Sequence, residues 1–577
     1  MLATWGSSSG INALLASSSL SLNFSNGSYT LGGVPYAVAS VPGYSFTRSS
    51  GGYAQNVDGS LTWFTGTRTN LNLQSQTLEN ASWGLTNATV TANAISSPDG
   101  TLTADFLKED TTTGNHSIYQ FIPTTATSYA ASIYAKAGTR SKMLFGGGGF
   151  LGQGLVATFD LANGTMYINT GSKGTITSAG NGWYRCSVIF TTSNTGGFSW
   201  NMCDAFGSST YTGDGVSGLY LWGAQVETTT DTRITYPTSY IPTTTAAVSV
   251  DTPRITNKGY LSEEARTNLA LQSQALATSP WSTDIAGSTT VVNNAGTAPD
   301  NTQTATSLTF TTQFANRTQT INVTAGITYA YSVWLKQISG NTNLSLTILY
   351  GAAISVLNPI TITNAWAKYT VFFTVPTAIT NMTVYVQDRN ASNFGTTYAW
   401  GAQVETGAFA TSYIPTTTAA ATRAADALKI TGNFMGSGPW TWLTDVASVP
   451  NQPGIYPGPG NFYKDVNNYL TIYAPNGAAS GNALNLNLKI AGSDVWNIQQ
   501  SGFTTGTAKI GMALIGSNVY GSVNGSASTS LGTNTLFVPV QISIGYGGSA
   551  NQVNGYVRGM TVWNSQFSTA QLQAITT

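Results

Sequence analysis

Charged side chains are scarce in this chain. Only 8% of its 577 residues are Asp, Glu, Lys or Arg, against about 25% in an ordinary soluble domain. The 22 basic residues balance the 22 acidic ones, so net charge gives no reason to expect a nucleic acid or an anionic membrane as partner. Aromatic residues are plentiful at 11%, whereas disordered segments are charge-rich and aromatic-poor. We therefore expect a folded protein whose solubility comes from Thr, Ser, Asn, Gln and Gly.

Histidine and cysteine are almost absent. A single histidine, His116, excludes a histidine-rich zinc site or a two-histidine mechanism within one chain. We expect this residue to lie on the surface in a turn, not to act as a catalytic base. Cys186 and Cys203 form no Cys-x-x-Cys pair. They are compatible with a bridge or with buried thiols, and so few cysteines favour buried, free thiols.

Long apolar segments are also missing. No run reaches the 18 apolar residues that suggest a membrane-spanning helix. The first 24 residues have neither a basic region nor a long apolar stretch, so they do not resemble a secretory signal. We expect no membrane insertion.

Repeated segments organise the rest of the chain. An opening segment occurs twice, as RTNLNLQSQ (68–76) and RTNLALQSQ (266–274). A closing segment also occurs twice, as GLYLWGAQVE (218–227) and TTYAWGAQVE (396–405), each followed by TSYIPTTTAA. Tyr129, Ser132 and Lys136 correspond to Tyr329, Ser332 and Lys336 between them. The order of these matches indicates one duplicated module, and the repeated segments themselves are expected to be structural joints.

The repeats divide the chain into five parts: a leader (1–67), a first module (68–248), a linker (249–265), a second module (266–422) and a terminal domain (423–577). Two interpretations of the leader stay open. It is either a strand and loop packed on the first module, which the sequence slightly favours, or an attachment segment for a larger assembly. Weak periodicity at 11–21 is compatible with one short helix. The linker holds the most charged stretch of the chain, which fits either a solvated connection or a docking strap.

Short strands dominate the expected secondary structure. In the first module, alternating or β-branched patterns predict strands at 117–122, 128–137, 155–161, 165–170, 183–192 and 218–227, with a hairpin at Asn163-Gly164. In the terminal domain, strands are expected at 440–446, 469–475, 483–490, 494–500, 508–525, 541–547 and 556–564. A short helix at 567–576 follows, with Ser568 as its N-cap. The fold class is therefore all-β, with tandem jelly-roll or β-sandwich domains after an extended leader.

Residues typical of catalysis do not form a recognisable motif. Asp105, Glu109 and Asp110 cluster, but we expect a polar loop there and not a pair of catalytic carboxylates. The glycine run at 146–149 lacks the Lys-Ser/Thr pair of a phosphate-binding loop and is interpreted as a loop insertion. We therefore expect no enzyme. A polysaccharide depolymerase stays open, because the separation of carboxylates in space cannot be read from sequence.

A carbohydrate-binding site needs exposed aromatic rings and short polar side chains, since sugars offer apolar faces and hydroxyl groups. The candidates are Trp200 and Asn201 in the first module, Gln387, Asp388, Arg389 and Asn390 in the second, and Trp440, Trp442, Tyr456, Tyr463 and Trp496 in the terminal domain. The loop 456–468 is the strongest of these. Trp222 and Trp400, inside the repeated strand, are expected to be core residues. No cofactor is expected, although Ca²⁺ at a module edge is conceivable with Asp160, Asp204 or Asp388 as donors.

A motif of bacteriophage virion proteins is similar to three parts of this chain. The motif consists of an F-T-R-x-S strand, the run G-L-L-x-E-E-x-R-T-N-L, and a Trp a few residues later. Here these parts are SFTRSS (45–50), GYLSEEARTNL (259–269), and Trp83 or Trp281. The first module departs from the motif, because TGTRTNL (65–71) lacks the two glutamates. The modules resemble the jelly-roll carbohydrate-binding modules of phage fibres and spikes. The segment 423–577 resembles concanavalin or laminin-G sandwiches, most clearly in GYVRGMTVWNSQFSTAQLQ (555–573).

The resemblance implies a role on a virion surface. It implies a fibre or spike on head or tail, made in the host cytoplasm, which binds host or environmental glycans. It also implies a homotrimer, and contact with other virion proteins through the N-terminal region. Two further functions stay open: a structural or decoration protein of capsid or tail and, less favoured, the depolymerase.

Overall fold

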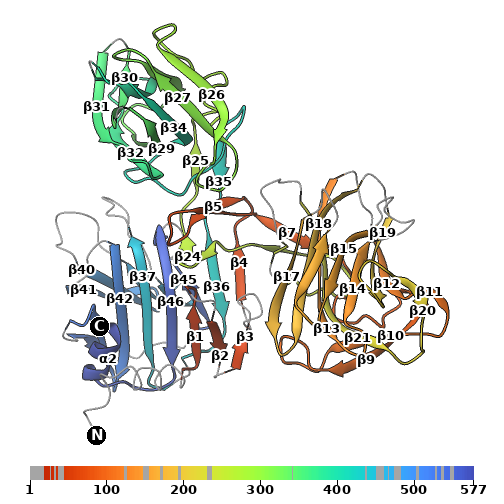
Figure 1. Cartoon of the computed structure of the whole chain (residues 1–577). Coiled ribbons are helices and arrows are strands. Elements are labelled where there is room, and N and C mark those ends of the chain that lie inside the picture. The colour runs from red at the N-terminus through yellow and green to blue at the C-terminus, as the bar shows by residue number, and fades with distance from the viewer. Residues whose placement is uncertain are drawn as a thin grey trace. The chain divides into compact units, whose positions relative to one another are not determined.

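The computed structural model describes most of the chain, and it is nearly all β (Figure 1). The described residues are 18–25, 28–31, 34–36, 44–122, 127–146, 155–168, 173–192, 196–229, 237–238, 240–340, 342–351, 353–390, 392–435, 438–449, 460–465, 467–473, 483–501, 506–526, 529–533, 539–545 and 552–577. The chain separates into two compact units, Thr67–Thr252 and Met1–Gly66 with Pro253–Thr577. The first unit is the first module. The second unit joins the leader, the linker, the second module and the terminal domain.

The first module is a sandwich of two antiparallel sheets. The sheet that contains the WGAQVE strand, here called the closing sheet, has the order β17 (Lys173–Gly180), β18 (Trp183–Thr192), β13 (Thr127–Ala137), β21 (Gly218–Thr228), β10 (Ala104–Glu109), β9 (Ala88–Ile95). The other, here called the opposite sheet, has the order β16 (Thr165–Ile168), β15 (Leu155–Asp160), β14 (Lys142–Gly146), β19 (Gly196–Cys203), β12 (Ser117–Ile122), β8 (Gly84–Thr86). Two small ladders flank them, β11 (Thr113–Asn115) with β20 (Thr210–Thr212), and β7 (Thr67–Asn70) with β22 (Val248–Asp251).

The second module repeats the central strands of this arrangement, but among the described residues its sheets have no counterparts of the outer strands β17, β16 and β8. Its closing sheet has the order β26 (Thr289–Gly296), β27 (Ala305–Phe310), β34 (Thr396–Thr406), β29 (Thr328–Ser339), β32 (Ala367–Thr374). Its opposite sheet has the order β28 (Asn316–Asn322), β33 (Asn381–Asp388), β30 (Asn343–Tyr350), β31 (Ala353–Thr361), and β25 (Arg266–Asn268) pairs with β35 (Ala421–Arg423). Ser132 opposes Gln225 as Ser332 opposes Gln403, and a bulge follows both serines. The predicted duplication is therefore confirmed at the level of register.

The terminal domain is a sandwich that the leader helps to build. One sheet has the order β3 (Val34–Tyr36), β2 (Ser28–Leu31), β1 (Leu20–Asn23), β46 (Gly555–Trp563), β37 (Thr441–Val449), β42 (Gly506–Ile515), β43 (Asn518–Val523), β44 (Thr529–Thr533). Linker strands β23 (Ile255–Thr256) and β24 (Gly259–Ser262) extend it, since β24 also pairs with β46. The second sheet has the order β4 (Tyr44–Thr47), β36 (Ala427–Thr431), β45 (Gln541–Ile544), β38 (Gly460–Asp465), β39 (Asn468–Tyr473), β40 (Ala483–Ile490), β41 (Ser493–Ser501).

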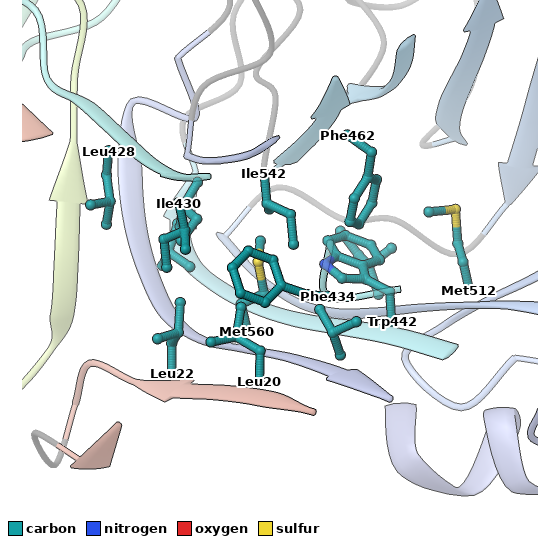
Figure 2. Packing of buried hydrophobic residues seen from close by; sticks show 14 of the residues in the cluster. Leu20, Leu22, Leu428, Ile430, Phe434, Trp442, Phe462, Met512, Ile542 and Met560 are labelled. Atoms are coloured by element: carbon teal, nitrogen blue, oxygen red, sulfur yellow. The ribbon is translucent and has the colours of Figure 1, made fainter. Parts of the chain in front are cut away.

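The leader's apolar residues lie in the core of this terminal sandwich. Figure 2 shows Leu20 and Leu22 of β1 facing Ile430, Trp442 and Met560. Burying these side chains removes apolar area from water and stabilises the pairing of the chain's two ends. The structure thus differs from the expectation that the leader packs on the first module. The proposed short helix at 11–21 is also wrong where it can be checked, because Leu20 and Ser21 belong to β1; residues 11–17 lie outside the described residues.

Most predicted elements of the modules and terminal domain are confirmed. The expected strand at 117–122 is β12 and that at 183–192 is β18. The Asn163-Gly164 turn joins β15 to β16 as predicted. The closing helix is α2 (Thr569–Thr576), where Ser568 and Gln571 form a reciprocal capping box. These elements rest on local patterns, which is why they are readable from sequence.

Each repeated segment closes its module through one buried asparagine. Asn70 Nδ2 donates to the carbonyl oxygens of Ala224 (3.1 Å) and Ile241 (2.7 Å). Its Oδ1 accepts from the backbone amides of Asn72 (3.0 Å) and Val226 (3.1 Å). The side chain thereby ties together the RTNL strand, the WGAQVE strand and the TSYIP segment.

The second module repeats this asparagine clamp. Asn268 donates to Ala402 O (3.0 Å) and Ile414 O (2.8 Å), and accepts from the amides of Ala270 (3.0 Å) and Val404 (3.0 Å). Both asparagines are fully buried. If either side chain were removed, its backbone partners would lose their hydrogen bonds, and water could not replace them. The repeated segments are structural joints, as the sequence suggested.

A hairpin of the leader, β5 (Gly52–Gln55) with β6 (Leu61–Phe64), contacts the second module. Tyr53 stacks on Tyr413 at 5.5 Å between ring centroids and meets Trp400 edge-on at 5.8 Å. Its hydroxyl donates to Asp300 Oδ2 at 2.7 Å. The leader therefore links the second module to the terminal sandwich.

Buried charges reinforce this junction. Arg254 binds Glu263 at 2.7 Å and forms a second ion pair with Asp426. Arg48 of the leader reaches Asp426 at 3.1 Å, and Arg423 reaches Glu263 at 3.2 Å. The three guanidinium groups are fully buried. Arg254 and Glu263 of the linker are thus buried and paired with residues that are distant in sequence, which differs from a fully solvated connection. A docking strap between the two modules stays a prediction.

The electrostatics of this ion cluster favour the ionised carboxylate. Burial alone would raise the pKa of Glu263, but the guanidinium groups of Arg423 and Arg254 outweigh it and lower the pKa to about 2. A carboxylate with a depressed pKa in the folded state stabilises the fold fully above its unfolded pKa. That stabilisation is lost as the pH falls from about 4.5 towards 2.

Removing the amide of the clamp should destabilise the second module. Asn268→Ala leaves two amides and two carbonyls unpaired in the interior, and we expect a loss of at least about 3 kcal/mol. Thermal unfolding followed by circular dichroism measures this loss. The control is Asn322→Ala, at the exposed end of β28. Equal melting curves for both variants would contradict the role of the clamp.

Removing one carboxylate of the ion cluster should loosen the junction. Asp426→Asn leaves Arg48 and Arg254 buried without their full counter-charge, and we expect a destabilisation of about 3–5 kcal/mol. The exposed Asp58→Asn on the β5–β6 turn is the matched control. Urea unfolding of both variants at pH 7 makes the comparison. A shift no larger for Asp426→Asn than for Asp58→Asn would show that the ion cluster does not stabilise the fold.

Candidate functional site

The predicted binding residues of the first module are buried. The Trp200 ring is only 3% exposed and packs on Phe145 at 4.6 Å between centroids. Sugar stacking on Trp200 is therefore not possible in this conformation. Asn201 is 5% exposed and donates to Ser199 Oγ at 3.0 Å and Gly146 O at 3.3 Å. Trp222 and Trp400 are core residues, as predicted.

The other predicted binding residues are distributed over two domains. Asp388 ends β33 and is fully buried, and its Oδ1 accepts from the amide of Asn390 at 2.9 Å. Trp440 and Trp442 lie in the core of the terminal sandwich. Tyr463 lies half-buried in β38. Tyr456 lies outside the described residues, and so does the side chain of Trp496. The predicted loop 456–468 is wrong where it can be checked, because Gly460–Asp465 form β38 and Asn468 begins β39.

A polar face forms on the opposite sheet of the second module. Leu344, Leu346, Ile348, Met382, Val384 and Val386 point into the core, so the residues between them point outwards. The residues that point away from the core on adjacent strands are Thr318, Thr320, Ser345, Thr347, Thr383, Tyr385 and Gln387. Of these, Thr320 is exposed and Thr383 is partly exposed, whereas the other five are buried under neighbouring residues. Thr320 bonds Thr383 at 2.9 Å and Ser345 bonds Thr347 at 3.2 Å. We call this surface the hydroxyl face.

An aromatic residue lies at one end of the hydroxyl face. Phe314 is 40% exposed, and its ring lies 5.1 Å from the guanidinium carbon of Arg389. Gln387 connects the two, because it donates to Phe314 O at 3.4 Å and accepts from Arg389 at 3.2 Å. The backbone of Phe314 has a φ of +65°, which is strained for a bulky residue and is often found at binding sites. The arrangement places an apolar ring beside amide and guanidinium donors.

Tyr385 occupies the middle of the hydroxyl face. Burial and the neighbouring carboxylate of Asp284 raise the pKa of Tyr385 to about 12. Its hydroxyl therefore stays protonated at neutral pH and can donate and accept hydrogen bonds. Ser282 borders the face, since its amide donates to Thr318 O at 2.9 Å.

The corresponding face of the first module is more aromatic. Tyr119 and Phe121 of β12 point outwards with ring centroids 5.5 Å apart, and Phe121 is 60% exposed. Tyr167 on β16 is 56% exposed and lies opposite Thr158. The two modules thus offer different surfaces at matching positions of the same sheet.

Sequence reasoning found only part of this face. Asn201 and Gln387 were both candidates, and they are equivalent in register, since Asn201 opposes Ser117 and Gln387 opposes Asn316. Arg389 was also found. Tyr385, Phe314 and the row of Ser and Thr side chains were missed. The alternation of threonines with apolar residues in NMTVYV (381–386) could have indicated them.

The acidic residues of the first module have structural partners. Asp105 and Glu109 lie in β10 and are buried, so the predicted polar loop is wrong. Burial raises the pKa of Asp105 to about 6, while its carboxylate accepts from the amides of Leu78 (2.8 Å) and Asn93 (2.9 Å). In the second module Thr306 receives the equivalent amide, that of Leu276, at 3.2 Å. The Thr306 hydroxyl thus accepts in the second module the hydrogen bond that the Asp105 carboxylate accepts in the first, which indicates a structural role for Asp105.

Glu109 and His116 are likewise held by neighbours. Glu109 accepts two hydrogen bonds from Arg140 and one from Tyr211. His116 is fully buried, not on the surface as expected, because its Nδ1 lies 2.7 Å from Asn87 O and its Nε2 lies 3.3 Å from Tyr211 O. The burial of His116 could not be read from its neighbours in sequence, because β11 pairs with β20, which is distant along the chain.

The Ca²⁺ candidates do not converge. Asp160 accepts from the backbone amides of Ala162 and Asn163 and so caps its own hairpin. Asp388 belongs to the other module. Among the described residues, no group of three or more His, Cys, Asp or Glu side chains could hold a metal ion. Asp204, the third candidate, is exposed directly after β19.

Cys186 and Cys203 are free and buried, as the sequence favoured. Burial raises the pKa of Cys203 to about 12 and also raises that of Cys186. Within the described part of the chain, no helix is long and apolar enough to cross a membrane.

A family model described as a carbohydrate-binding domain matches residues 274–393. This segment begins just after β25 and ends after β33, so it contains Phe314, Tyr385 and Arg389. The match covers one module and not the whole chain. A search of curated proteins found no match.

Solved structures of carbohydrate-binding modules resemble parts of the chain. A CBM4 structure is 17% identical with a TM-score of 0.18, covering 22% of this chain and 86% of its own. A family 16 carbohydrate-binding module is 22% identical with a TM-score of 0.20, covering 24% and 99%. The tandem CBM22 domains of Paenibacillus barcinonensis Xyn10C are 11% identical with a TM-score of 0.22, covering 62% and 99%. Such low scores carry no argument about ligand or activity.

Proposed function

We propose that this chain is a non-catalytic glycan-binding protein whose second module binds saccharides on its hydroxyl face. Two findings that concern the same residues support the proposal. The carbohydrate-binding family model matches residues 274–393, and the same residues build a face of hydroxyl and amide groups with an exposed ring at its end.

The chemistry of the face suits a sugar. Saccharide hydroxyls would pair with the side chains of Thr320 and Thr383, which are exposed or partly exposed and can donate or accept. The Phe314 ring offers the apolar surface on which a pyranose stacks. Arg389 adds a donor at the rim that is already oriented by Gln387. Such a mixture of one aromatic and a few fixed polar groups is typical of small-molecule sites.

The first module is proposed as a second binding unit with a different preference. Tyr119, Phe121 and Tyr167 would give it more stacking surface than the second module has. Two unlike faces on one chain would increase avidity for a glycan that carries both determinants.

The finer proposal is a bacteriophage virion surface protein, a fibre or spike of head or tail. It rests on the similarity of 45–50 and 259–269 to the phage motif. Within it, the chain associates as a homotrimer and contacts other virion proteins through the N-terminal region. A purely structural or decoration role is the alternative if glycans do not bind. Deleting 423–577 is a poor test of that alternative, because β1 and β4 of the leader would lose their partners.

Glycan binding is tested on the full chain with an array of bacterial capsular, lipopolysaccharide and plant oligosaccharides, followed by titration of the strongest hit. We expect Phe314→Ala to weaken that binding about fivefold, which corresponds to about 1 kcal/mol of stacking. The matched control is Phe372→Ala, since Phe372 is 49% exposed on the closing sheet. Absence of binding to every glycan, or equal losses in both variants, would refute the proposed site.

Virion placement is tested with antibodies against the purified chain. We expect immunogold labelling of intact phage particles at projecting fibres or spikes. We also expect a sedimenting species of three times the chain mass of 60.4 kDa. Unlabelled particles would contradict the virion assignment without touching glycan binding, and a monomer would contradict only the trimer.

A further inference from the structure

A groove lies on the outer surface of the terminal sandwich, in a different domain from the hydroxyl face. Its cavity volume is about 510 Å³, within the usual range of roughly 300–1,000 Å³ for small-molecule sites. Strands β1, β46, β37 and β42, which lie side by side in Figure 1, form its floor. The polar lining includes Ser21, Asn23, Asp445, Lys509, Arg558 and Thr561.

Two features of the sequence form this groove: side chains alternate between the core and the surface along the strands, and one surface position is a glycine. Leu22, Val446, Ile510 and Met560 point into the core, so Asn23, Asp445 and Lys509 point outwards. These three outward residues lie in one row across the sheet, with Gly559 between Asn23 and Asp445. Because Gly559 has no side chain, the row has a gap at its centre.

Helix α2 covers only the neighbouring part of the same surface. Leu572 and Ile575 pack with Trp563 and Ala513. The helix can approach because Gly511 has no side chain: a Cβ there would lie 2.8 Å from Thr576 Cγ2. The helix thus forms a wall, and Leu443, which is partly exposed, contributes most of the apolar surface beside the edge of Ile575.

Positive charge exceeds negative charge among the described side chains that line the groove. Two are basic, Lys509 and Arg558, and one is acidic, Asp445. Arg558 Nε and Nη2 both donate to Asp445 Oδ1, at 2.9 and 2.5 Å. The pair is about one-third exposed on the arginine side and 26% exposed on the aspartate side. Lys509 is the basic side chain that forms no ion pair with an acidic side chain among the described residues, and its Nζ donates to an oxygen of Thr577 at 3.2 Å.

We propose that this groove binds an acidic saccharide. The carboxylate of a uronic or sialic acid would pair with Lys509 and with the outer edge of Arg558. Ring hydroxyls would pair with Asn23, Ser21 and Thr561, each of which offers a donor or acceptor. Leu443 and the edge of Ile575 would contact the apolar face of the ring. A neutral sugar would leave the excess positive charge unmatched.

This site does not depend on the hydroxyl face, because it belongs to another domain and another chemistry. The chain would thus carry sites for two kinds of sugar, and a polysaccharide that contains acidic and neutral units would engage both.

The test is calorimetric titration of the full chain at low ionic strength with trigalacturonate, a hyaluronan tetrasaccharide and 3′-sialyllactose, each paired with a neutral oligosaccharide of the same length. We expect at least one acidic sugar to bind about tenfold more tightly than its neutral partner. Lys509→Gln should weaken it about fivefold and Asp445→Asn should strengthen it about fivefold, as expected for one partly screened charge. Added salt should weaken the interaction.

Two variants provide the controls. Lys464→Gln makes the same charge change at an exposed position of β38 in the other sheet of the sandwich, and it should leave the affinity unchanged. Phe314→Ala should also leave it unchanged. Equal losses from Lys464→Gln and Lys509→Gln would show non-specific charge attraction and overturn the site. Loss with Phe314→Ala would move the acidic sugar to the second module. No difference between acidic and neutral sugars would overturn the ligand class.

Discussion

A buried asparagine amide is the interaction on which both modules depend. Asn70 and Asn268 each use both donors and accept from two backbone amides, which joins the first, last and exit segments of a sandwich. An apolar residue of the same size would leave four backbone groups unpaired in the interior. The near-identity of the RTNL and WGAQVE segments follows from this constraint. The repeats are therefore fixed by closure of the fold, while the opposite sheets are free to differ.

A second constraint joins the parts that follow the first module. The leader supplies strands to both sheets of the terminal sandwich, and its Arg48 meets Asp426 and the linker's Arg254 in a buried ion cluster. Only 8% of the residues are charged, and several of these charged side chains are buried in this junction. Burial of these paired charges leaves even fewer charged side chains for the surface.

Elements that depend on local sequence patterns could be predicted. Elements that depend on pairing between distant segments could not. Strands, the Asn163-Gly164 turn and the Ser568 cap are encoded by neighbouring residues and were found. The partners of the leader were not, because β1 pairs with β46 more than 500 residues later. His116 appeared to be a surface residue because the element that buries it, β20, is also distant in sequence. Trp200 was a candidate by residue type, but its strand parity turns it inwards. On the hydroxyl face the amide of Gln387 was found, whereas the Ser and Thr rows and Phe314 required the strand order.

Shared residues close the modules, and differing residues present the surface. Hydrogen–deuterium exchange of the full chain, with and without its strongest array glycan, tests it most directly. We expect slower exchange on binding at the ends of β28 and β33 and around Phe314, or at the matching ends of β12 and β19. We expect no change in the RTNL and WGAQVE strands, which are already buried. Protection confined to those repeated strands would contradict this expectation.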